Sequence, residues 1–241
     1  MSFLTAEWQK LVFLNYKINS QLLMPYLPAG TKLDLWNGDC YVSLVGMMFD
    51  NTKLLGIRVP FHVKFEEVNL RFYVNRIENG IIKKGVVFIK EIVPKPALTY
   101  VAKLVYDEKY ETLPMSHSWL LEEDVYTITY NWKKKDTWNT MQVTAESKMH
   151  KITRHSDAEF IIERYWGYAK VDDTKSYEYE VKHPRWEIYA INQYECKVDF
   201  KTLYGEKFDF LSQANPDSVM LVEGSPVSIE KRRAITSISR K

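Results

Sequence analysis

The ten-residue segment 65–74, FEEVNLRFYV, constrains the fold of this chain more than any other segment. Successive side chains of a β-strand point to opposite faces. One face of this segment is therefore apolar and consists of Val68, Leu70, Phe72 and Val74. The other face carries an acid, an amide, a base and a phenol, namely Glu67, Asn69, Arg71 and Tyr73. The apolar face requires a core, whereas the polar face either meets solvent, with cross-strand ion pairs, or lines a cavity.

Short apolar runs between turn residues predict many strands in the 241-residue chain. Asn79 and Gly80 form a two-residue hairpin signal that pairs segment 65–74 with an antiparallel strand over residues 85–93. Asn37 and Gly38 predict a second hairpin, between strands 32–36 and 40–49. Further strands are expected at residues 125–132, 140–147, 160–169, 177–183, 186–200, 218–222 and 226–230. Short helices are expected at residues 19–27, 97–106 and 203–213.

Many strands and few helices indicate a mainly β fold. No repeat, low-complexity tract or Pro/Gly/Ser-rich linker divides the sequence, so we expect a single domain over residues 1–230. The expected architecture is an antiparallel barrel-like sheet or a curled sandwich with two or three short helices. Residues 231–241 are basic and polar and are predicted to form a frayed tail.

Composition argues against several classes of protein. The formal net charge is only +2, from 33 basic and 31 acidic residues, so no electrostatic footprint for nucleic acid is present. Cys40 and Cys196 lie far apart and outside any zinc or disulfide pattern. We expect neither a metal nor a cofactor, because no phosphate loop or metal-binding motif occurs. No apolar stretch reaches the ~20 residues that span a bilayer. We therefore expect a reduced, cytoplasmic protein without membrane attachment, and the oligomeric state stays open.

The strand predicted after Asn79 and Gly80 is apolar on both faces and should be covered on both. Lys90 and Glu91 are adjacent in it and point to opposite faces. At least one of them then enters a desolvated environment, where it needs a partner. The alternative is that both lie near the strand end and reach water.

Two further residues are candidates for the same site. His183 falls on the apolar side of its strand, where it is either a general acid or base or a core histidine bonded to a carbonyl or carboxylate. Tyr165 lies in an aromatic run, Glu163–Tyr168, which suits a barrel wall and is equally well explained by ordinary packing.

Several motifs lie along the chain over roughly residues 8–230, and they include Tyr26-Leu-Pro-Ala-Gly30, Val59-Pro-Phe-His62, segment 65–74, Tyr165-Trp-Gly-Tyr168 and His183-Pro-Arg-Trp186. Taken together, these motifs resemble the YqjF-like family of bacterial proteins, a domain of unknown function. That family is grouped by fold with acetoacetate decarboxylase, whose β-barrel-like architecture encloses a cavity. The resemblance implies that the polar face of segment 65–74 lines a pocket.

The resemblance also bears on mechanism. Acetoacetate decarboxylase forms a Schiff base on a lysine whose pKa is lowered by a neighbouring lysine. The loosely corresponding segment here, residues 110–116, carries Met115 and Ser116 at those two positions. The resemblance therefore implies a mechanism other than a Lys-Lys Schiff base.

Two functions follow as hypotheses. In the first, the protein is a cofactor-independent enzyme for a small organic acid. Its acid/base candidates are Glu67, Glu91 and His183, and its substrate-binding residues are Asn69, Arg71, Tyr73 and Tyr165. Arg71 would hold the carboxylate through a bidentate contact. In the second, the protein is a non-catalytic binder of a carboxylate or aromatic metabolite. A third possibility is that these polar residues form a structural hydrogen-bond network.

Overall fold

The computed structural model describes residues 2–96 and 109–236. The helix predicted at residues 97–106 lies outside the described residues. In chain order the strands are β1 (Leu4–Ile18), β2 (Lys32–Leu33), β3 (Cys40–Leu54), β4 (Phe65–Glu78), β5 (Ile81–Val93), β6 (Tyr110–Thr112), β7 (Met115–Glu122), β8 (Val125–Lys134), β9 (Thr137–Lys151), β10 (Trp166–Lys170), β11 (Lys175–Lys182), β12 (Glu187–Lys197), β13 (Ser218–Ile229) and β14 (Arg233–Thr236). The short helices are α1 (Ser20–Leu23), η1 (Met24–Tyr26), α3 (Asp157–Ile162), α4 (Phe200–Tyr204) and η2 (Glu206–Ser212).

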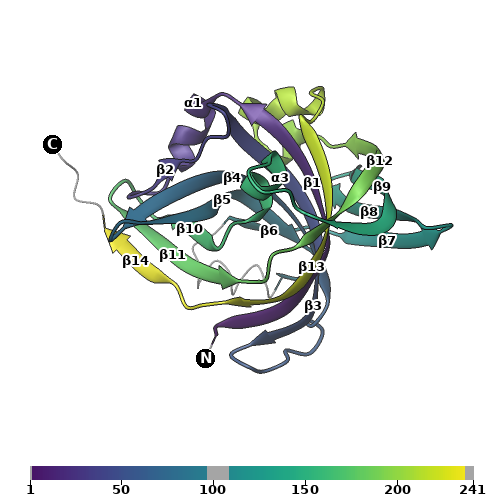
Figure 1. The fold of residues 1–241 in the computed structure, drawn as a ribbon, viewed down its shortest axis with the longest axis horizontal. Helices are drawn as coiled ribbons and strands as arrows, with labels where there is room; N and C mark the ends of the chain where they lie inside the picture. Colours follow the sequence, from purple (N-terminus) through teal and green to yellow (C-terminus); the bar gives the residue numbers. More distant parts are fainter. Residues whose placement is uncertain (1, 97–108, 237–241) are drawn as a thin grey trace.

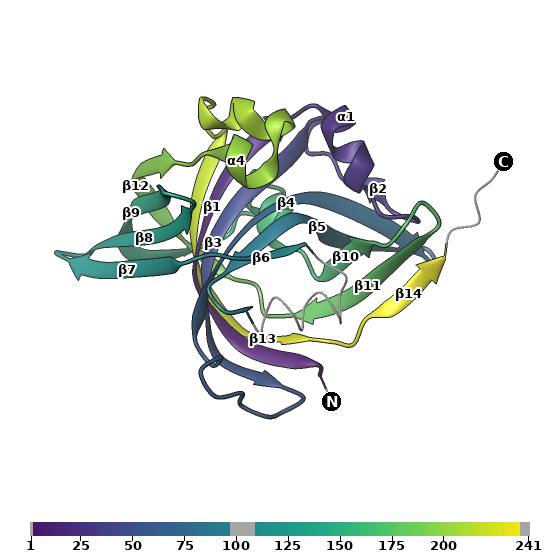
Figure 2. The same ribbon diagram turned by 180° about the vertical axis from the view of Figure 1, so that it is seen from behind.

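Seven strands form a closed circuit in the order β11, β10, β5, β4, β3, β1 and β13. The circuit closes where Val181 and Lys182 of β11 pair with Ile229 and Ser228 of β13. Strands β12, β9, β8 and β7 continue the same sheet away from β13 as an arm (Figures 1 and 2). The sheet is mixed, since β5 pairs in parallel with β10 and with β6. The prediction of a mainly β, barrel-like fold is confirmed, although the complete sheet is not a strict barrel.

The hairpin between β4 and β5 forms as predicted. Asn79 and Gly80 both have positive φ, 51° and 78°, as a type I′ turn requires. The turn pairs Glu78 with Ile81. Asn37 and Gly38 also form a turn with positive φ. That turn closes only an isolated bridge, and β2 pairs with β4 rather than with β3.

The circuit is covered on both sides. The apolar face of β4 belongs to a core outside the circuit that also contains Phe200, Leu203 and Phe208 of α4 and η2. A second core lies inside the circuit and includes Tyr73 of β4. The apolar residues of β5 divide between these two cores. The expectation that this part of the sheet is covered on both faces is therefore confirmed.

The single strand predicted at residues 160–169 is wrong over its first part, because α3 occupies residues 157–162. Ser156 caps this helix, its Oγ accepting a hydrogen bond from the Glu159 backbone N–H at 3.2 Å. Ser156 and Glu159 thus form the S-x-x-E pattern that begins many helices. The strand itself is β10, which starts at residue 166.

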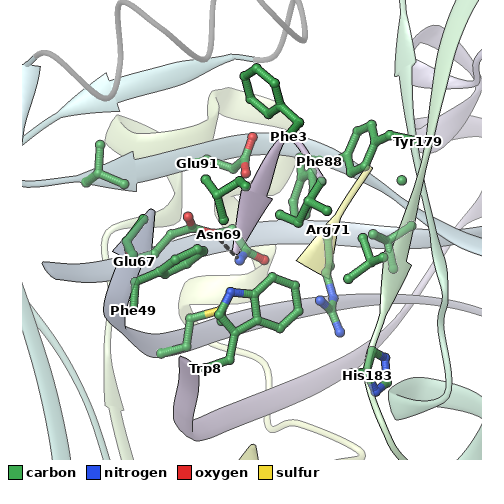
Figure 3. A pocket seen from close by; sticks show the side chains of 18 of the residues that line it. Phe3, Trp8, Phe49, Glu67, Asn69, Arg71, Phe88, Glu91, Tyr179 and His183 are labelled. Atoms are coloured by element: carbon green, nitrogen blue, oxygen red, sulfur yellow. Dashed lines mark hydrogen bonds between the residues drawn. The ribbon is translucent and has the colours of Figure 1, made fainter. Parts of the chain in front are cut away.

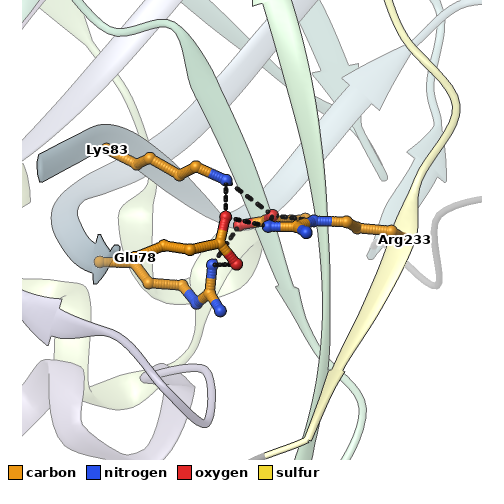
Figure 4. A network of polar contacts seen from close by, with 5 residues as sticks. Glu78, Lys83 and Arg233 are labelled. Atoms are coloured by element: carbon orange, nitrogen blue, oxygen red, sulfur yellow. Dashed lines mark hydrogen bonds and ion pairs between the residues drawn. The ribbon is translucent and has the colours of Figure 1, made fainter. Parts of the chain in front are cut away.

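The chain end also differs from prediction, because residues 233–236 of the expected tail form β14 and pair with β11. Figure 4 shows the charged network at this edge. The Glu178 side chain of β11 is fully buried and ion-paired with Arg76 at 3.3 Å and Lys83 at 3.1 Å, and it also pairs with Arg233. The same three cations pair with Glu78. A buried carboxylate requires such partners, and here they connect four strands, β4, β5, β11 and β14.

The network responds to acid through Glu78. Hydrogen bonds from Lys83, Arg76 and Arg233 lower the pKa of Glu78 to about 2. A carboxyl whose pKa is lower in the folded protein stabilises the fold above the unfolded pKa, ~4.3. Its contribution is therefore lost as the pH falls from about 4.5 towards 2.

Among the described residues, no helix has both the length and the apolar character of a membrane span.

Candidate functional site

A cavity of about 170 Å³ lies inside the strand circuit. Its wall is largely apolar and aromatic and includes Trp8, Phe49, Phe65, Phe88, Tyr179 and Trp186. The polar residues of the wall include Glu67, Asn69, Arg71, Glu91, Arg164 and His183. A cavity of roughly 150 Å³ is large enough for benzene. The site therefore has room for a small organic molecule.

Alternation along β4 turns Glu67, Asn69 and Arg71 towards this cavity (Figure 3). The opposite face of β4 packs in the outer core, so the polar residues point into the space enclosed by the strand circuit. The three residues are 4%, 1% and 7% exposed. The structure therefore places this part of the polar face inside the fold.

Arg71 is a buried cation that forms no ion pair within the described part of the chain. No ion pair or hydrogen bond of its guanidinium occurs among residues 2–96 and 109–236. Its nearest ring contacts are Phe13 and Tyr73, whose centroids lie 5.0 and 6.0 Å from the guanidinium carbon. An aromatic face stabilises a cation only partly. A buried charge in this state is costly to the free protein, and an anion in the cavity would offset that cost.

Glu67 and Asn69 form the other polar end of β4's inner face. The Asn69 Nδ2 donates a hydrogen bond to the Glu67 Oε1 at 2.9 Å. Burial raises the pKa of Glu67 to about 7, against the opposing effects of this hydrogen bond and of the Arg71 charge. Near neutral pH, the Glu67 carboxyl is thus present in both protonation states. That is the condition under which a carboxyl group can both accept and donate a proton.

Glu91 joins this end of the cavity because of a β-bulge. The register between β4 and β5 shifts by one residue between the Leu70–Lys90 and Arg71–Phe88 pairs. Strict alternation in β5 predicts Phe88 and Glu91 on opposite faces. The extra residue of the bulge shifts this alternation by one, so the two side chains point to the same face. Both residues line the cavity. Glu91 lies opposite Asn69 and its Oε1 accepts a hydrogen bond from the Tyr110 hydroxyl at 2.6 Å.

We expect the raised pKa of Glu67 to make stability pH-dependent. The folded protein holds the Glu67 proton more tightly than the unfolded chain does, so stability falls as pH rises from about 4.5 to 7. At 1.4 kcal/mol per pKa unit, the full effect is on the order of 3 kcal/mol. Glu67→Gln should therefore be more stable than wild type at pH 8, with a much smaller difference at pH 5. Urea unfolding at the two pH values measures this.

The matched control is Glu180→Gln, because Glu180 is a half-exposed strand residue paired with Lys182. Its effect should be small at both pH values. An equal change in stability for Glu67→Gln at pH 5 and pH 8 would contradict an elevated Glu67 pKa.

Tyr73 does not line the cavity. Its hydroxyl is hydrogen-bonded to the Ser43 Oγ at 2.5 Å, and Ser43 in turn donates to the Asn15 Oδ1 at 2.6 Å. Its ring lies beside the Arg71 guanidinium. Tyr73 is therefore a neighbour of Arg71 in the inner core rather than a residue of the cavity wall.

His183 lines the cavity, and its imidazole ring is fixed by two stacked aromatic rings and two backbone carbonyl oxygens. Tyr165 and Trp186 stack on its two faces, with centroid distances of 4.6 and 4.0 Å. The Nδ1 lies 2.8 Å from the Pro184 carbonyl oxygen and the Nε2 lies 3.3 Å from that of Arg164. Burial lowers the pKa of His183. Tyr165 does not line the cavity, and its hydroxyl donates to Glu163. This arrangement matches the structural alternative for the histidine.

Arg164 and Trp8 are among the wall residues that were not predicted as site residues. Arg164 sits at the exit of α3, where its Nε donates to the Phe160 carbonyl oxygen at 2.6 Å and its guanidinium pairs with Asp34. Trp8 enters the wall beside a bulge in β1, where Gly224, at φ +87°, lets the strands approach closely. The position of Arg164 could not be predicted because the sequence pattern indicates a strand where α3 forms. The position of Trp8 could not be predicted because the sequence does not indicate where β1 has a bulge. No cluster of three or more potential metal ligands occurs among the described residues.

Solved structures with a similar fold identify the fold class of this chain. The acetoacetate decarboxylase of Legionella pneumophila has a TM-score of 0.64 at 13% identity, over 96% of this chain and 87% of that chain. An acetoacetate decarboxylase-like enzyme of Sphingomonas wittichii RW1 gives 0.62 at 12%, over 99% and 95%. The enduracididine biosynthesis enzyme MppR complexed with pyruvate gives 0.67 at 10%, over 97% and 91%. These likenesses confirm the acetoacetate decarboxylase-like fold.

The family relationship rests on sequence. No match was found among curated proteins. A family model, DUF2071, described as an uncharacterised conserved protein, matches residues 5–226. Because this match spans most of the sequence, the chain belongs to the DUF2071 family.

Proposed function

We propose that this protein is an enzyme for a small organic acid, which Arg71 holds by its carboxylate while Glu67 transfers a proton. The observation that carries the proposal is the guanidinium of Arg71. It is buried, it borders the cavity, and it has no ion pair among the described residues. A carboxylate fits the planar fork of a guanidinium with two parallel hydrogen bonds.

Glu67 supplies the acid/base chemistry in this proposal. Its near-neutral pKa suits proton transfer at physiological pH. It lies four residues before Arg71 on the same strand face, so the two backbones are roughly 13 Å apart. The proton therefore leaves or joins the substrate at atoms remote from the carboxylate. Glu91 also borders the cavity and lies opposite Asn69 on the neighbouring strand. His183 has a structural role in the cavity wall in this proposal.

The mostly apolar wall favours a second candidate, a non-catalytic binder for an organic acid with an apolar body. Catalysis separates the two candidates. We expect ¹H NMR of organic-acid mixtures in D₂O to show conversion or deuterium incorporation with wild type. Glu67→Gln should lose this reaction while acids still raise its melting temperature. Binding without any reaction in wild type would support the binder and refute the enzyme.

The proposal further includes a mechanism without a lysine imine. Within the described part of the chain, no lysine borders the cavity. Met115 begins β7 and packs against the outer core rather than in the cavity wall. We expect borohydride treatment in the presence of pyruvate to leave the protein mass unchanged. A mass increase matching a reduced pyruvate adduct would overturn this part of the proposal.

A further inference from the structure

The cavity wall has two chemically different ends. At one end, the Arg71 guanidinium offers hydrogen-bond donors and positive charge. At the other end, Glu67 and Asn69 offer acceptor oxygens. Figure 3 shows Glu67 on one side of Asn69 and the Arg71 guanidinium on the other, with Glu91 above Asn69. A ligand that fills the cavity meets both ends at once.

The side-chain amide of Asn69 indicates which hydrogen-bonding group the acceptor end of the cavity would bind. Its Nδ2 faces the Glu67 carboxylate, which accepts a hydrogen bond from it. This orientation leaves the Asn69 Oδ1 as a free acceptor. The Oδ1 is fully buried and has no hydrogen-bond partner in the described part of the chain. A buried acceptor without a partner destabilises the free protein, and a donor on a ligand would remove that penalty.

We propose that the ligand carries a hydrogen-bond donor, a hydroxyl or an amine, at the end remote from its carboxylate. Asn69 and Glu67 accept this donor while Arg71 holds the carboxylate. This inference rests on the proposed function and deepens it, because it names the class of substrate as a hydroxy or amino monocarboxylate. A second carboxylate at this end would meet Glu67 and be repelled when Glu67 is ionised.

The strand spacing sets the length of such a ligand. Asn69 and Arg71 are two residues apart on one face, which is roughly 7 Å along the strand. The donor and the carboxylate are therefore separated by several bonds rather than carried on one carbon. Trp8 and Phe88 border the cavity beside these residues. They suit an apolar or aromatic linker between the two polar groups.

Matched pairs of acids test this inference by calorimetric titration. The pairs are 4-hydroxybenzoate with benzoate and 5-aminopentanoate with pentanoate. In wild type, the donor-bearing acid of each pair should bind at least about 10-fold more tightly. In Asn69→Leu, the two acids of a pair should bind equally. In Glu67→Gln, the preference for the hydroxyl should persist, while the preference for the ammonium group should shrink.

The outcomes separate the two proposals. Equal binding within both pairs by wild type, together with loss of all binding in Arg71→Met, overturns the donor inference and leaves the proposed function intact. Absence of binding for all four acids in wild type overturns both. If Asn69→Leu does not fold, the selective loss of ammonium preference in Glu67→Gln decides the inference, because its persistence there would contradict the assigned acceptor end.

Discussion

Arg71→Met should abolish carboxylate binding and at the same time stabilise the free protein. Loss of the partner of a buried, hydrogen-bonded charge costs about 2–5 kcal/mol of binding free energy. Replacing a buried ion pair by apolar side chains of similar size is often stabilising, by about 1–4 kcal/mol, and we expect a gain in the same direction for a buried cation that has no ion pair to lose. Calorimetry with 4-hydroxybenzoate measures the first effect and urea unfolding the second. The free energy of unfolding is best compared near pH 5. Glu67 is protonated there, so removal of the Arg71 charge does not destabilise an ionised carboxylate.

Two variants make this result specific. Arg71→Lys keeps the charge without the planar fork and should bind more weakly than wild type but more tightly than Arg71→Met. Arg185→Met removes a half-exposed arginine that pairs with Glu159 at 2.7 Å outside the cavity. It should leave binding unchanged. A marked loss of stability in Arg71→Met would instead indicate that Arg71 is a structural residue.

Glu178→Ala should be the most destabilising single change at the edge of the strand circuit. It removes the fully buried carboxylate and leaves Arg76, Lys83 and Arg233 with Glu78 as their shared acid (Figure 4). Breaking a buried ion pair by removing one partner costs about 3–5 kcal/mol. We expect a loss of this size in urea unfolding, together with increased hydrogen exchange in β14, because Arg233 connects that strand to the network.

Glu180→Ala is the matched control for this prediction. Glu180 lies two residues further along β11 and pairs with Lys182 near the surface, at 3.4 Å. Exposed pairs of this kind contribute about 0–1 kcal/mol. Similar losses for the two variants would show that burial of Glu178 does not govern the strength of the network.

The sequence predicts the parts of the fold that depend on short-range signals. The turn at Asn79 and Gly80 follows from the positive φ that these residues tolerate. The two-faced pattern of residues 65–74 follows from strand geometry and is what directs Glu67, Asn69 and Arg71 to one side. Neither signal depends on the rest of the chain, so both can be read from a single segment.

What the sequence does not reveal depends on long-range geometry. The bulge in β5 brings Phe88 and Glu91 to the same side of the sheet, and nothing in that apolar run specifies where the extra residue falls. The stacking of Tyr165 and Trp186 on His183 joins side chains that come together only when β10 and β11 are paired. The tail residues 233–236 form a strand by pairing with β11, which lies more than fifty residues earlier in the chain and places Glu178 opposite Arg233. These features arise only when the strands are assembled.

A crystal structure of the protein with 4-hydroxybenzoate would show directly which residues hold the two polar groups of the ligand. We expect both carboxylate oxygens within about 2.7–2.9 Å of the Arg71 guanidinium nitrogens. We expect the hydroxyl at the end of the cavity formed by Glu67 and Asn69. A carboxylate held by Arg164 instead, or an acid bound outside the strand circuit while the Arg71 guanidinium stays unpaired, would contradict the proposed binding mode.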